Sequence, residues 1–122
     1  MPNTADFQKM ADQFCAAYND GQPEAGVEAY AEDACVVAPD GRLARGREQI
    51  RALFTDRAKR YADLHVKVDE VHEIADGVVV AILTSTGVDQ SSKRRLTGRG
   101  IATLRSEEHV NWQVVAHAWA DH

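Results

Sequence analysis

The sequence predicts an α+β domain in which helices cover one face of an antiparallel sheet. Up to residue 61, apolar residues recur at intervals of three and four, which is typical of amphipathic helices. From residue 66 onward the period falls to two and turn residues separate four strand patterns, which indicates a meander. No internal repeat or linker divides the 122 residues, so we expect one domain spanning residues 1–122.

The first expected element is an amphipathic helix over residues 5–19. Its apolar residues share one face, and Tyr18 lies near the carboxyl end of that face. Gly21 suits the left-handed position that follows a helix, and Pro23 suits the first turn of a second, shorter helix. We expect this second helix to include Tyr30 and to end at residues 32–34.

A short strand pair and a third helix complete the first half. Residues 35–38 are rich in apolar and β-branched side chains, and they meet a Pro-Asp-Gly turn. The next helical pattern begins near residue 46 and carries Phe54 and Tyr61 on its apolar face. The helices therefore precede most of the sheet along the chain.

The second half has the pattern of four strands. The first strand pattern starts at Val66, and Ala75-Asp76-Gly77 marks the hairpin that ends it. Residues 78–86 follow as a nearly continuous apolar strand. Polar loops around residues 89–93 and 106–111 separate two further strands. Short loops between consecutive strands predict antiparallel neighbours.

The strand at residues 78–83 is apolar on both faces of its pleat. One face can pack against the helices, but the other needs a partner of its own. Two-fold pairing of identical chains is the commonest way to cover such a surface. We therefore expect a homodimer formed through the sheet.

Composition and charge exclude several classes of partner. The formal net charge is −5, so the average surface repels nucleic acid and anionic lipid. The basic stretch Lys93-Arg94-Arg95 lacks the interleaved aromatic residues that base stacking requires. No window approaches the roughly 18 apolar residues of a membrane span, and the first residues have no signal-peptide pattern. We expect a cytoplasmic protein that binds neither nucleic acid nor a membrane.

The sequence predicts no metal and no cofactor. Cys15 and Cys35 lie in apolar-periodic segments without metal-ligand spacing, which favours buried free thiols. His65 and His72 are seven residues apart, so they lie on opposite faces of a strand unless a bulge intervenes. No set of three possible ligands has a recognised spacing, and no glycine-rich phosphate loop precedes a helix.

Four short stretches give the chain its likeness to a known family. They are Ala17-Tyr18-Asn19-Asp20-Gly21, Tyr30-Ala31-Glu32-Asp33-Ala34, Pro39-Asp40-Gly41 with Gly46-Arg47-Glu48-Gln49-Ile50, and Trp112-Gln113-Val114-Val115 with Trp119. In this order they resemble the SnoaL-like (polyketide cyclase-like) branch of the nuclear transport factor 2-like superfamily. The resemblance implies a cystatin-like cone, in which three helices of the N-terminal half and a strongly bent antiparallel sheet enclose a pocket. It assigns no activity, because the fold hosts several unrelated functions.

The last predicted strand carries the best candidate for chemistry. Alternation places Gln113, Val115, His117 and Trp119 on one face, and the resemblance implies that this face lines the pocket. His117 is then the candidate catalytic residue, because a histidine can act as acid or base near neutral pH. The alternative is a hydrogen-bonded core histidine beside a packing tryptophan.

Five residues are candidates for ligand binding: Tyr18, Tyr30, Phe54, Arg99 and Trp119. An inward Arg99 would hold an anionic group such as a carboxylate, although the loop lengths leave its strand register open. Tyr18 can pack its ring and aim its hydroxyl at a ligand. Tyr30, Phe54 and Trp119 are expected to form walls of the pocket.

Specific enzyme patterns of the fold are mostly absent. The positions at which ketosteroid isomerases carry a carboxylate base, a tyrosine and a protonated aspartate hold Ala38, Phe14 and Ile101. The paired carboxylates of limonene-type epoxide hydrolases are also missing from the inward faces. A dehydratase mechanism stays open, in which His117 removes a proton α to a carbonyl while Tyr18 polarises the oxygen.

Two functions remain as hypotheses. The first is a small-molecule-binding SnoaL-like cavity protein, with acid/base chemistry of the cyclase, isomerase or dehydratase type on a small cyclic or polyketide-like metabolite. The second is a noncatalytic dimeric association or ligand-sensing module with a vestigial pocket. Three polar or aromatic candidates on the inner faces exceed what a purely structural core needs, which favours an occupied pocket.

Overall fold

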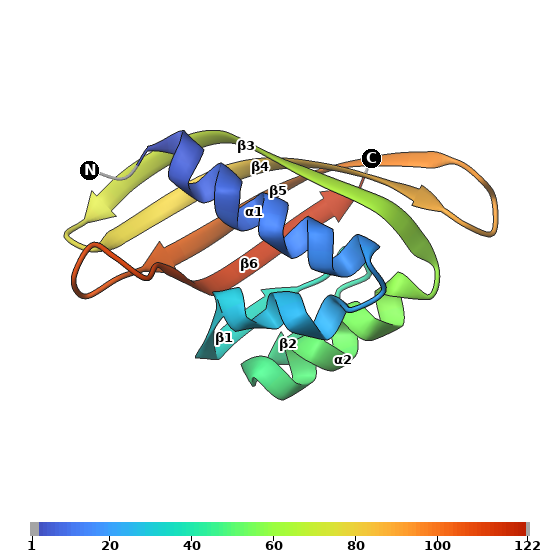
Figure 1. Ribbon diagram of the computed structural model, residues 1–122, viewed down its shortest axis with the longest axis horizontal. Coiled ribbons are helices and arrows are strands. Elements are labelled where there is room, and N and C mark those ends of the chain that lie inside the picture. The colour runs from blue at the N-terminus through green and yellow to red at the C-terminus, as the bar shows by residue number, and fades with distance from the viewer. Residues whose placement is uncertain (1–2, 122) are drawn as a thin grey trace.

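The computed structural model describes residues 3–121. Its elements are α1 (Thr4–Asn19), the 3₁₀ helix η1 (Pro23–Ala29), β1 (Tyr30–Val37), β2 (Leu43–Arg45), α2 (Gly46–Ala58), β3 (Tyr61–Ala75), β4 (Val78–Asp89), β5 (Arg95–Arg105) and β6 (Gln113–Asp121). The helices lie in the first half of the chain and the long strands in the second (Figure 1), which confirms the predicted order.

The six strands form one mixed sheet in the order β2-β1-β6-β5-β4-β3. Strands β3 to β6 pair in succession and antiparallel, as the meander pattern predicts. Strand β1 instead runs parallel to β6, with Val36 opposite His117. The expectation of a wholly antiparallel sheet is therefore wrong for this pair. No hairpin joins the two strands, so the connection does not fix their relative direction.

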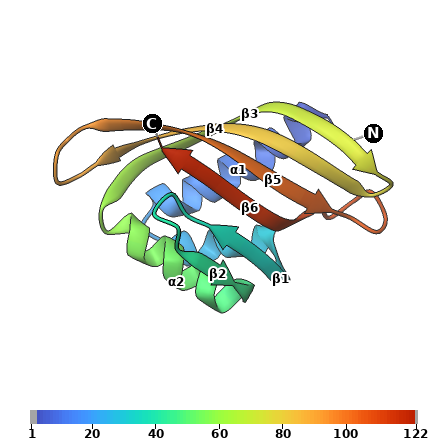
Figure 2. The ribbon, with the colours of Figure 1, turned by 180° about the vertical axis from the view of Figure 1, so that it is seen from behind.

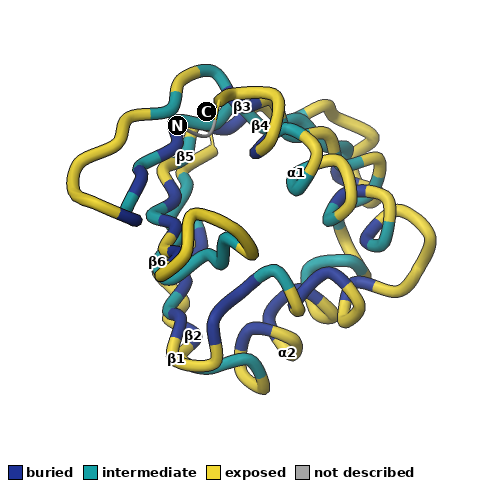
Figure 3. The backbone as a smooth tube through the Cα atoms, turned by 60° about the vertical axis from the view of Figure 1, so that its left-hand side comes forward, coloured by how far each residue is buried: buried dark blue, intermediate teal, exposed yellow. Residues whose placement is uncertain are grey.

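The sheet is bent, and the helices lie on its concave side. Helix α1 crosses the long strands, whereas α2 lies beside β1 and β2 (Figures 1 and 2). Seen from another direction, α1, α2 and the sheet surround a common centre (Figure 3). This is the α+β architecture that the residue patterns predict, with the bent sheet that the family resemblance implies (Figure 3). No helix within residues 3–121 has the length and apolar character needed to cross a membrane.

The second helix is shorter than predicted. It is a 3₁₀ helix that ends at Ala29, and Tyr30 opens β1 instead of continuing it. Tyr30 pairs with Val114 of β6, so a strand partner distant in sequence outweighs the local helical period. Tyr61 differs in the same way, since α2 ends at Ala58 and Tyr61 opens β3.

Two predicted glycine turns are present. Gly21 has a φ of 80° directly after α1, and Gly77 has a φ of 72° in the β3–β4 hairpin. Glycine adopts this left-handed conformation without the steric cost of a Cβ. A Cβ on Gly77 would also lie only 2.3 Å from the carbonyl oxygen of Ser106. This hairpin therefore tolerates no side chain at Gly77.

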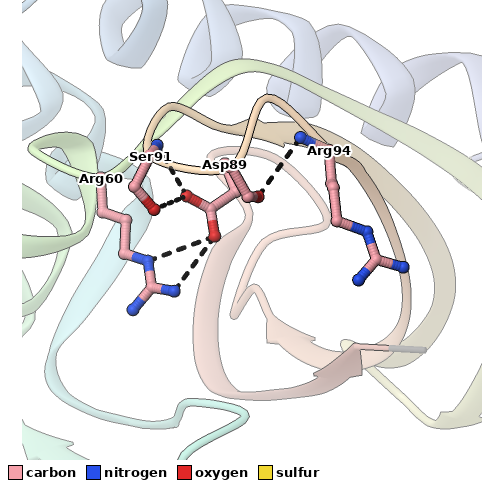
Figure 4. Close-up of polar contacts among 5 residues, drawn as sticks. Arg60, Asp89, Ser91 and Arg94 are labelled. Atoms are coloured by element: carbon pink, nitrogen blue, oxygen red, sulfur yellow. Dashed lines mark hydrogen bonds and ion pairs between the residues drawn. The ribbon is translucent and has the colours of Figure 1, made fainter.

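A nearly buried carboxylate anchors the far end of the β4–β5 hairpin. Asp89 accepts hydrogen bonds from the Ser91 amide at 2.9 Å, the Ser91 hydroxyl at 2.7 Å and Nη2 of Arg60 at 3.1 Å (Figure 4). Hydrogen bonds from Ser91 and then Arg60 hold the pKa of this carboxyl well below its usual range. Arg60 follows α2, so the cluster ties the hairpin to the end of that helix.

Two clusters of buried side chains fill the interior. The first lies among η1, β1 and α2 and includes Val27, Val36 and Ile50. The second lies between α1 and the meander and includes Phe7, Val79 and Leu104. Members of both clusters line a cavity, which therefore lies where the two halves of the core meet.

Candidate ligand-binding site

A cavity of about 150 Å³ lies between the helices and the concave face of the sheet. Helices α1 and α2 and the strands β3 to β6 all contribute to its wall, which is mostly apolar and aromatic. An apolar cavity of about this volume in another protein binds one benzene molecule. The space therefore suits a ligand of about one six-membered ring.

The topology gathers most of the predicted site residues around this cavity. Its wall includes Tyr18 from α1, Tyr30 from β1, Phe54 from α2, and His117 and Trp119 from β6. These positions come from four elements that are distant in sequence. The alternation of the last strand identified His117 and Trp119, but a register shift in β6 puts Val114 in the wall in place of the predicted Gln113 and Val115.

Arg99 lies elsewhere, exposed on the opposite face of the sheet. Its neighbours Gly98 and Gly100 line the cavity, so strand parity turns Arg99 outward. A Cβ on Gly100 would lie 2.9 Å from the Cβ of Trp119, so the inner face has no room there for a larger side chain. The inward orientation considered for Arg99 is therefore wrong.

The cation in the cavity wall is Arg57, which the sequence analysis missed. Its Cζ lies 4.5 Å from the ring centroid of Tyr61 and 5.1 Å from that of Trp119. Within residues 3–121, no carboxylate forms an ion pair with it. The signal in the sequence was its spacing: Arg57 follows Phe54 by three residues and so lies on a neighbouring part of the same helix face.

His117 and Tyr30 form a hydrogen-bonded pair in the mostly apolar wall. The hydroxyl oxygen of Tyr30 lies 3.0 Å from Nδ1 of His117. Tyr30 is buried, and its hydroxyl has no other partner in the described part of the chain. In the tautomer that carries the ring proton on Nε2, the hydroxyl donates to Nδ1. The Nε2–H then has no protein partner among residues 3–121 and can donate to a ligand.

The charge states of this pair follow from burial. Burial lowers the pKa of His117 to about 4 and raises the pKa of Tyr30. Both side chains are therefore neutral at pH 7. General acid–base catalysis is most efficient when the pKa of the group lies near the working pH. This environment makes His117 a better hydrogen-bond donor than a base at neutral pH.

Trp119 lies at the centre of the aromatic wall. Its ring stacks on Phe54, with centroids 5.9 Å apart and planes at 10°, and on His117, with centroids 5.0 Å apart and planes at 26°. The guanidinium of Arg57 packs over the same indole. Trp119 therefore contacts both the cation and the imidazole of the cavity wall.

Tyr18 has a hydroxyl that is already engaged. It donates to the carbonyl oxygen of Tyr61 at 2.8 Å, which ties α1 to the start of β3. Burial raises the pKa of Tyr18 to about 12, and the nearby charge of Arg57 opposes that rise. The ring of Tyr18 lines the cavity, but its hydroxyl proton is already used in the hydrogen bond to the carbonyl oxygen of Tyr61.

The described residues do not assemble a metal centre. No group of three or more His, Cys, Asp or Glu side chains within residues 3–121 is arranged to hold an ion. His65 and His72 are both exposed, and a bulge interrupts the strand between them. Each contacts its own carboxylate neighbour, Asp63 at 3.0 Å and Glu70 at 2.9 Å.

The amino-acid sequence of the chain matches the model of a known protein family. Residues 11–117 match the SnoaL-like domain. The chain belongs to the SnoaL-like domain family. This membership confirms the predicted branch of the nuclear transport factor 2-like superfamily. A search of curated proteins finds no match to the chain.

Solved structures share the fold of this SnoaL-like protein at low sequence identity. A ketosteroid isomerase-like protein from Erwinia carotovora atroseptica has a TM-score of 0.80 at 15% identity, covering 97% of this chain and 95% of that chain. An uncharacterised protein with a cystatin-like fold from Caulobacter vibrioides has a TM-score of 0.80 at 22% identity, covering 98% and 89%.

A third solved structure contains a small molecule. It is a protein with a ketosteroid isomerase-like fold from Catenulispora acidiphila in complex with trimethylamine, with a TM-score of 0.68 at 18% identity. The match covers 93% of this chain and 83% of that chain. At such identities the likeness shows the fold alone, because proteins of one fold perform many functions.

Proposed function

We propose that this SnoaL-like protein binds a small one-ring carboxylate in its cavity. The observation that carries the proposal is Arg57, a guanidinium that stacks on Tyr61 and Trp119 in the wall of an apolar cavity. It has no ion-pair partner in the part of the chain that the structure describes. A planar guanidinium of this kind binds carboxylates through two parallel hydrogen bonds.

His117 supplies the second polar contact. Its Nε2–H can donate to a carbonyl, hydroxyl or ether oxygen, while Tyr30 fixes the tautomer through Nδ1. The indole of Trp119 contacts both His117 and Arg57, so a flat ring that packs beside it lies near both groups. The ligand class that fits is a ring with an anionic group on one side and an acceptor on another.

The cavity volume narrows that class further. Pockets for drug-sized ligands have volumes of about 300–1,000 Å³. The cavity of this protein, at about 150 Å³, is smaller than that range. We therefore favour monocyclic ligands over steroids or polycyclic polyketide-like metabolites.

Binding is better supported than turnover. Burial lowers the pKa of His117 to about 4, so its imidazole is a weak base and is poorly suited to remove a proton from a substrate at pH 7. Of the described residues that line the cavity, Asp121 alone carries a carboxylate, and it is exposed at the end of β6. We therefore place cyclase, isomerase or dehydratase chemistry by His117 second to simple ligand binding.

The charge of the ligand provides the test. Isothermal titration would compare benzoate with its neutral analogue benzamide on the wild type, Arg57→Gln and Arg99→Gln. We expect the Arg57→Gln variant to lose about 10- to 100-fold in benzoate affinity, the range for a hydrogen bond to a charged group. The Arg99→Gln variant is the matched control, since Arg99 is exposed on the other face, and it should bind as the wild type does. Equal losses in both variants, or equal binding of benzoate and benzamide by the wild type, would refute the proposal.

We also propose a homodimer through the outer face of the sheet. The strand register aligns Ile82, Ile101, Ala118, Val37 and Leu43 in one row across β4, β5, β6, β1 and β2. The larger members of this row include some of the most exposed apolar side chains described: Val37 is 40% exposed, Leu43 45% and Ile101 47%. A continuous apolar row of this kind is typical of an interface, and a second copy of the chain presents the same row.

A further inference from the structure

A groove on the surface adjoins the cavity. It has a volume of about 800 Å³ and lies among α1, η1 and the loop that joins β5 to β6. The groove and the cavity share four lining residues, Phe7, Met10, Phe14 and Ala29. These four residues form the wall between the two spaces, and we refer to them as the partition.

Phe14 occupies the middle of the partition. On the cavity side, its ring packs edge-on against Phe54 at 5.0 Å and Tyr30 at 6.1 Å between centroids. On the groove side it meets Gly26, where a Cβ would lie 2.7 Å from Cδ2 of Phe14. Gly26 lines the groove and is not part of the cavity wall. The Phe14 ring therefore fills the space between a residue of the groove and two residues of the cavity.

The other members of the partition are less suited to close it. Phe7 is buried and packs edge-on against Trp112, with centroids 5.6 Å apart, so it belongs to the core. Ala29 has only a methyl group to contribute. Met10 is unbranched and adapts its shape to its surroundings. Phe14 is a bulky member that is only partly buried, and its ring contacts residues of the groove and of the cavity.

We propose that Phe14 determines the length of ligand that the cavity accepts, by closing the cavity toward the groove. The inference rests on the proposed function, since it assumes a ligand in the cavity. A smaller side chain at this position would let a substituent on the bound ring continue into the groove. Gly26 contributes to this closure as well, because the absence of a Cβ at Gly26 leaves room for the ring of Phe14. The substitution Gly26→Ala would press the Phe14 ring toward Phe54 and Tyr30 and reduce the space for a ligand.

Neutral probes of different length test this role. Titrations followed by ¹H–¹⁵N spectra would compare benzene with n-butylbenzene on the wild type, Phe14→Leu, Gly26→Ala and Leu83→Ala. Leu83 lines the cavity from β4 and is not part of the partition, so Leu83→Ala is the matched control for lost volume alone. The same spectra report whether each variant is folded.

We expect Phe14→Leu to bind n-butylbenzene about tenfold more tightly relative to benzene, because part of the alkyl chain becomes buried in the groove. Gly26→Ala should bind benzene more weakly than the wild type, and Leu83→Ala should show no comparable preference for the longer probe. The inference fails if Phe14→Leu gains nothing for n-butylbenzene, or if Leu83→Ala gains as much.

The outcome is separate from that of the benzoate experiment. The probes are uncharged, so their binding does not depend on Arg57. Loss of the carboxylate preference with a retained length effect would refute the proposed function and keep the role of Phe14. A carboxylate preference without a length effect would keep the proposed function and refute the role of Phe14.

Discussion

The two faces of strand β5 differ in the size of their side chains. Gly98, Gly100 and Ala102 face the cavity, whereas Arg99 and Ile101 point away from it. The small inner residues leave room for Trp119 and for the cavity, whereas on the other side Ile101 belongs to the apolar row. In β5, the side that faces the cavity is distinguished from the outer side more by small side chains than by polarity.

The largest expected change in the free energy of unfolding follows from shortening a large side chain on the inner face of β5. Leu104 lies in the same core cluster as Phe7 and Val79, so Leu104→Ala should lower the free energy of unfolding by about 2–5 kcal/mol. Thr97 is exposed on the outer face of the same strand, and Thr97→Ala should change that free energy by less than about 0.5 kcal/mol. Urea unfolding at pH 7 measures both. Similar losses in the two variants would contradict the difference between the faces.

The second effect is a pH dependence that originates on the inner face. The native pKa of His117, about 4, lies below the usual histidine value of about 6.5, so the unfolded chain binds more protons between these values. Stability should therefore decrease as pH falls from about 6.5 toward 4, by up to about 3 kcal/mol from this residue. Asp89 has a depressed pKa, so its contribution is retained in this window and is lost only below about pH 4.

Unfolding midpoints at pH 7 and pH 4.5 check this pH dependence. His117→Gln should flatten it, whereas His65→Gln, which changes an exposed histidine, should leave it as in the wild type. A wild-type slope that persists in His117→Gln would contradict the assignment of the pH dependence to His117.

The third effect concerns Gly100, whose absent side chain leaves room for Trp119 on the inner face of β5. In Gly100→Ala the new Cβ would lie 2.9 Å from the Cβ of Trp119 and 3.0 Å from the carbonyl oxygen of Ala118. We expect a loss of about 1–3 kcal/mol, the usual cost of overpacking, together with a shift in tryptophan fluorescence. Arg99→Ala, one residue away on the outer face, should do neither. An unchanged spectrum and stability for Gly100→Ala would show that the inner face has space to spare.

The smallest effect on the stability of the single chain is expected on the outer face. Ile101→Glu places a charge within the apolar row, where the side chain is 47% exposed in one copy. The variant should fold normally but should lose the proposed dimer, because burying an unpaired carboxylate is costly. Light scattering after size exclusion would give two copies for the wild type and one for the variant. A wild type that is already monomeric would contradict the proposed interface.

The order of the elements and the family could be predicted from the sequence because both rest on local patterns. Apolar spacing identified the helices and the meander, and Gly21 and Gly77 marked turns whose conformation depends on few neighbours. Alternation along the last strand also placed His117 and Trp119 on one face, and both line the cavity. Such features need no knowledge of a distant partner.

The remaining features depend on contacts between distant segments. Tyr30 fits a helical period, but its pairing with β6 makes it part of a strand. The inward or outward position of Arg99 depends on a strand register that one residue in a loop would reverse. The contact of Arg57 with Trp119 depends on β6, a strand that no local pattern brings to α2. These are the points at which tertiary structure overrides the local pattern.

The parallel pairing of β1 with β6 also has a consequence during synthesis of the chain, because β1 is made long before its partner strand. Tyr30 and His117 are 87 positions apart, so at about 5–20 residues per second β1 waits roughly 4–17 s on the ribosome for its partner. During that time β2, with three residues, covers only part of one edge of β1. An uncovered strand edge is a template for pairing with other chains. Slower translation between these two strands should therefore increase aggregation of the nascent protein, even though the finished sheet is unchanged.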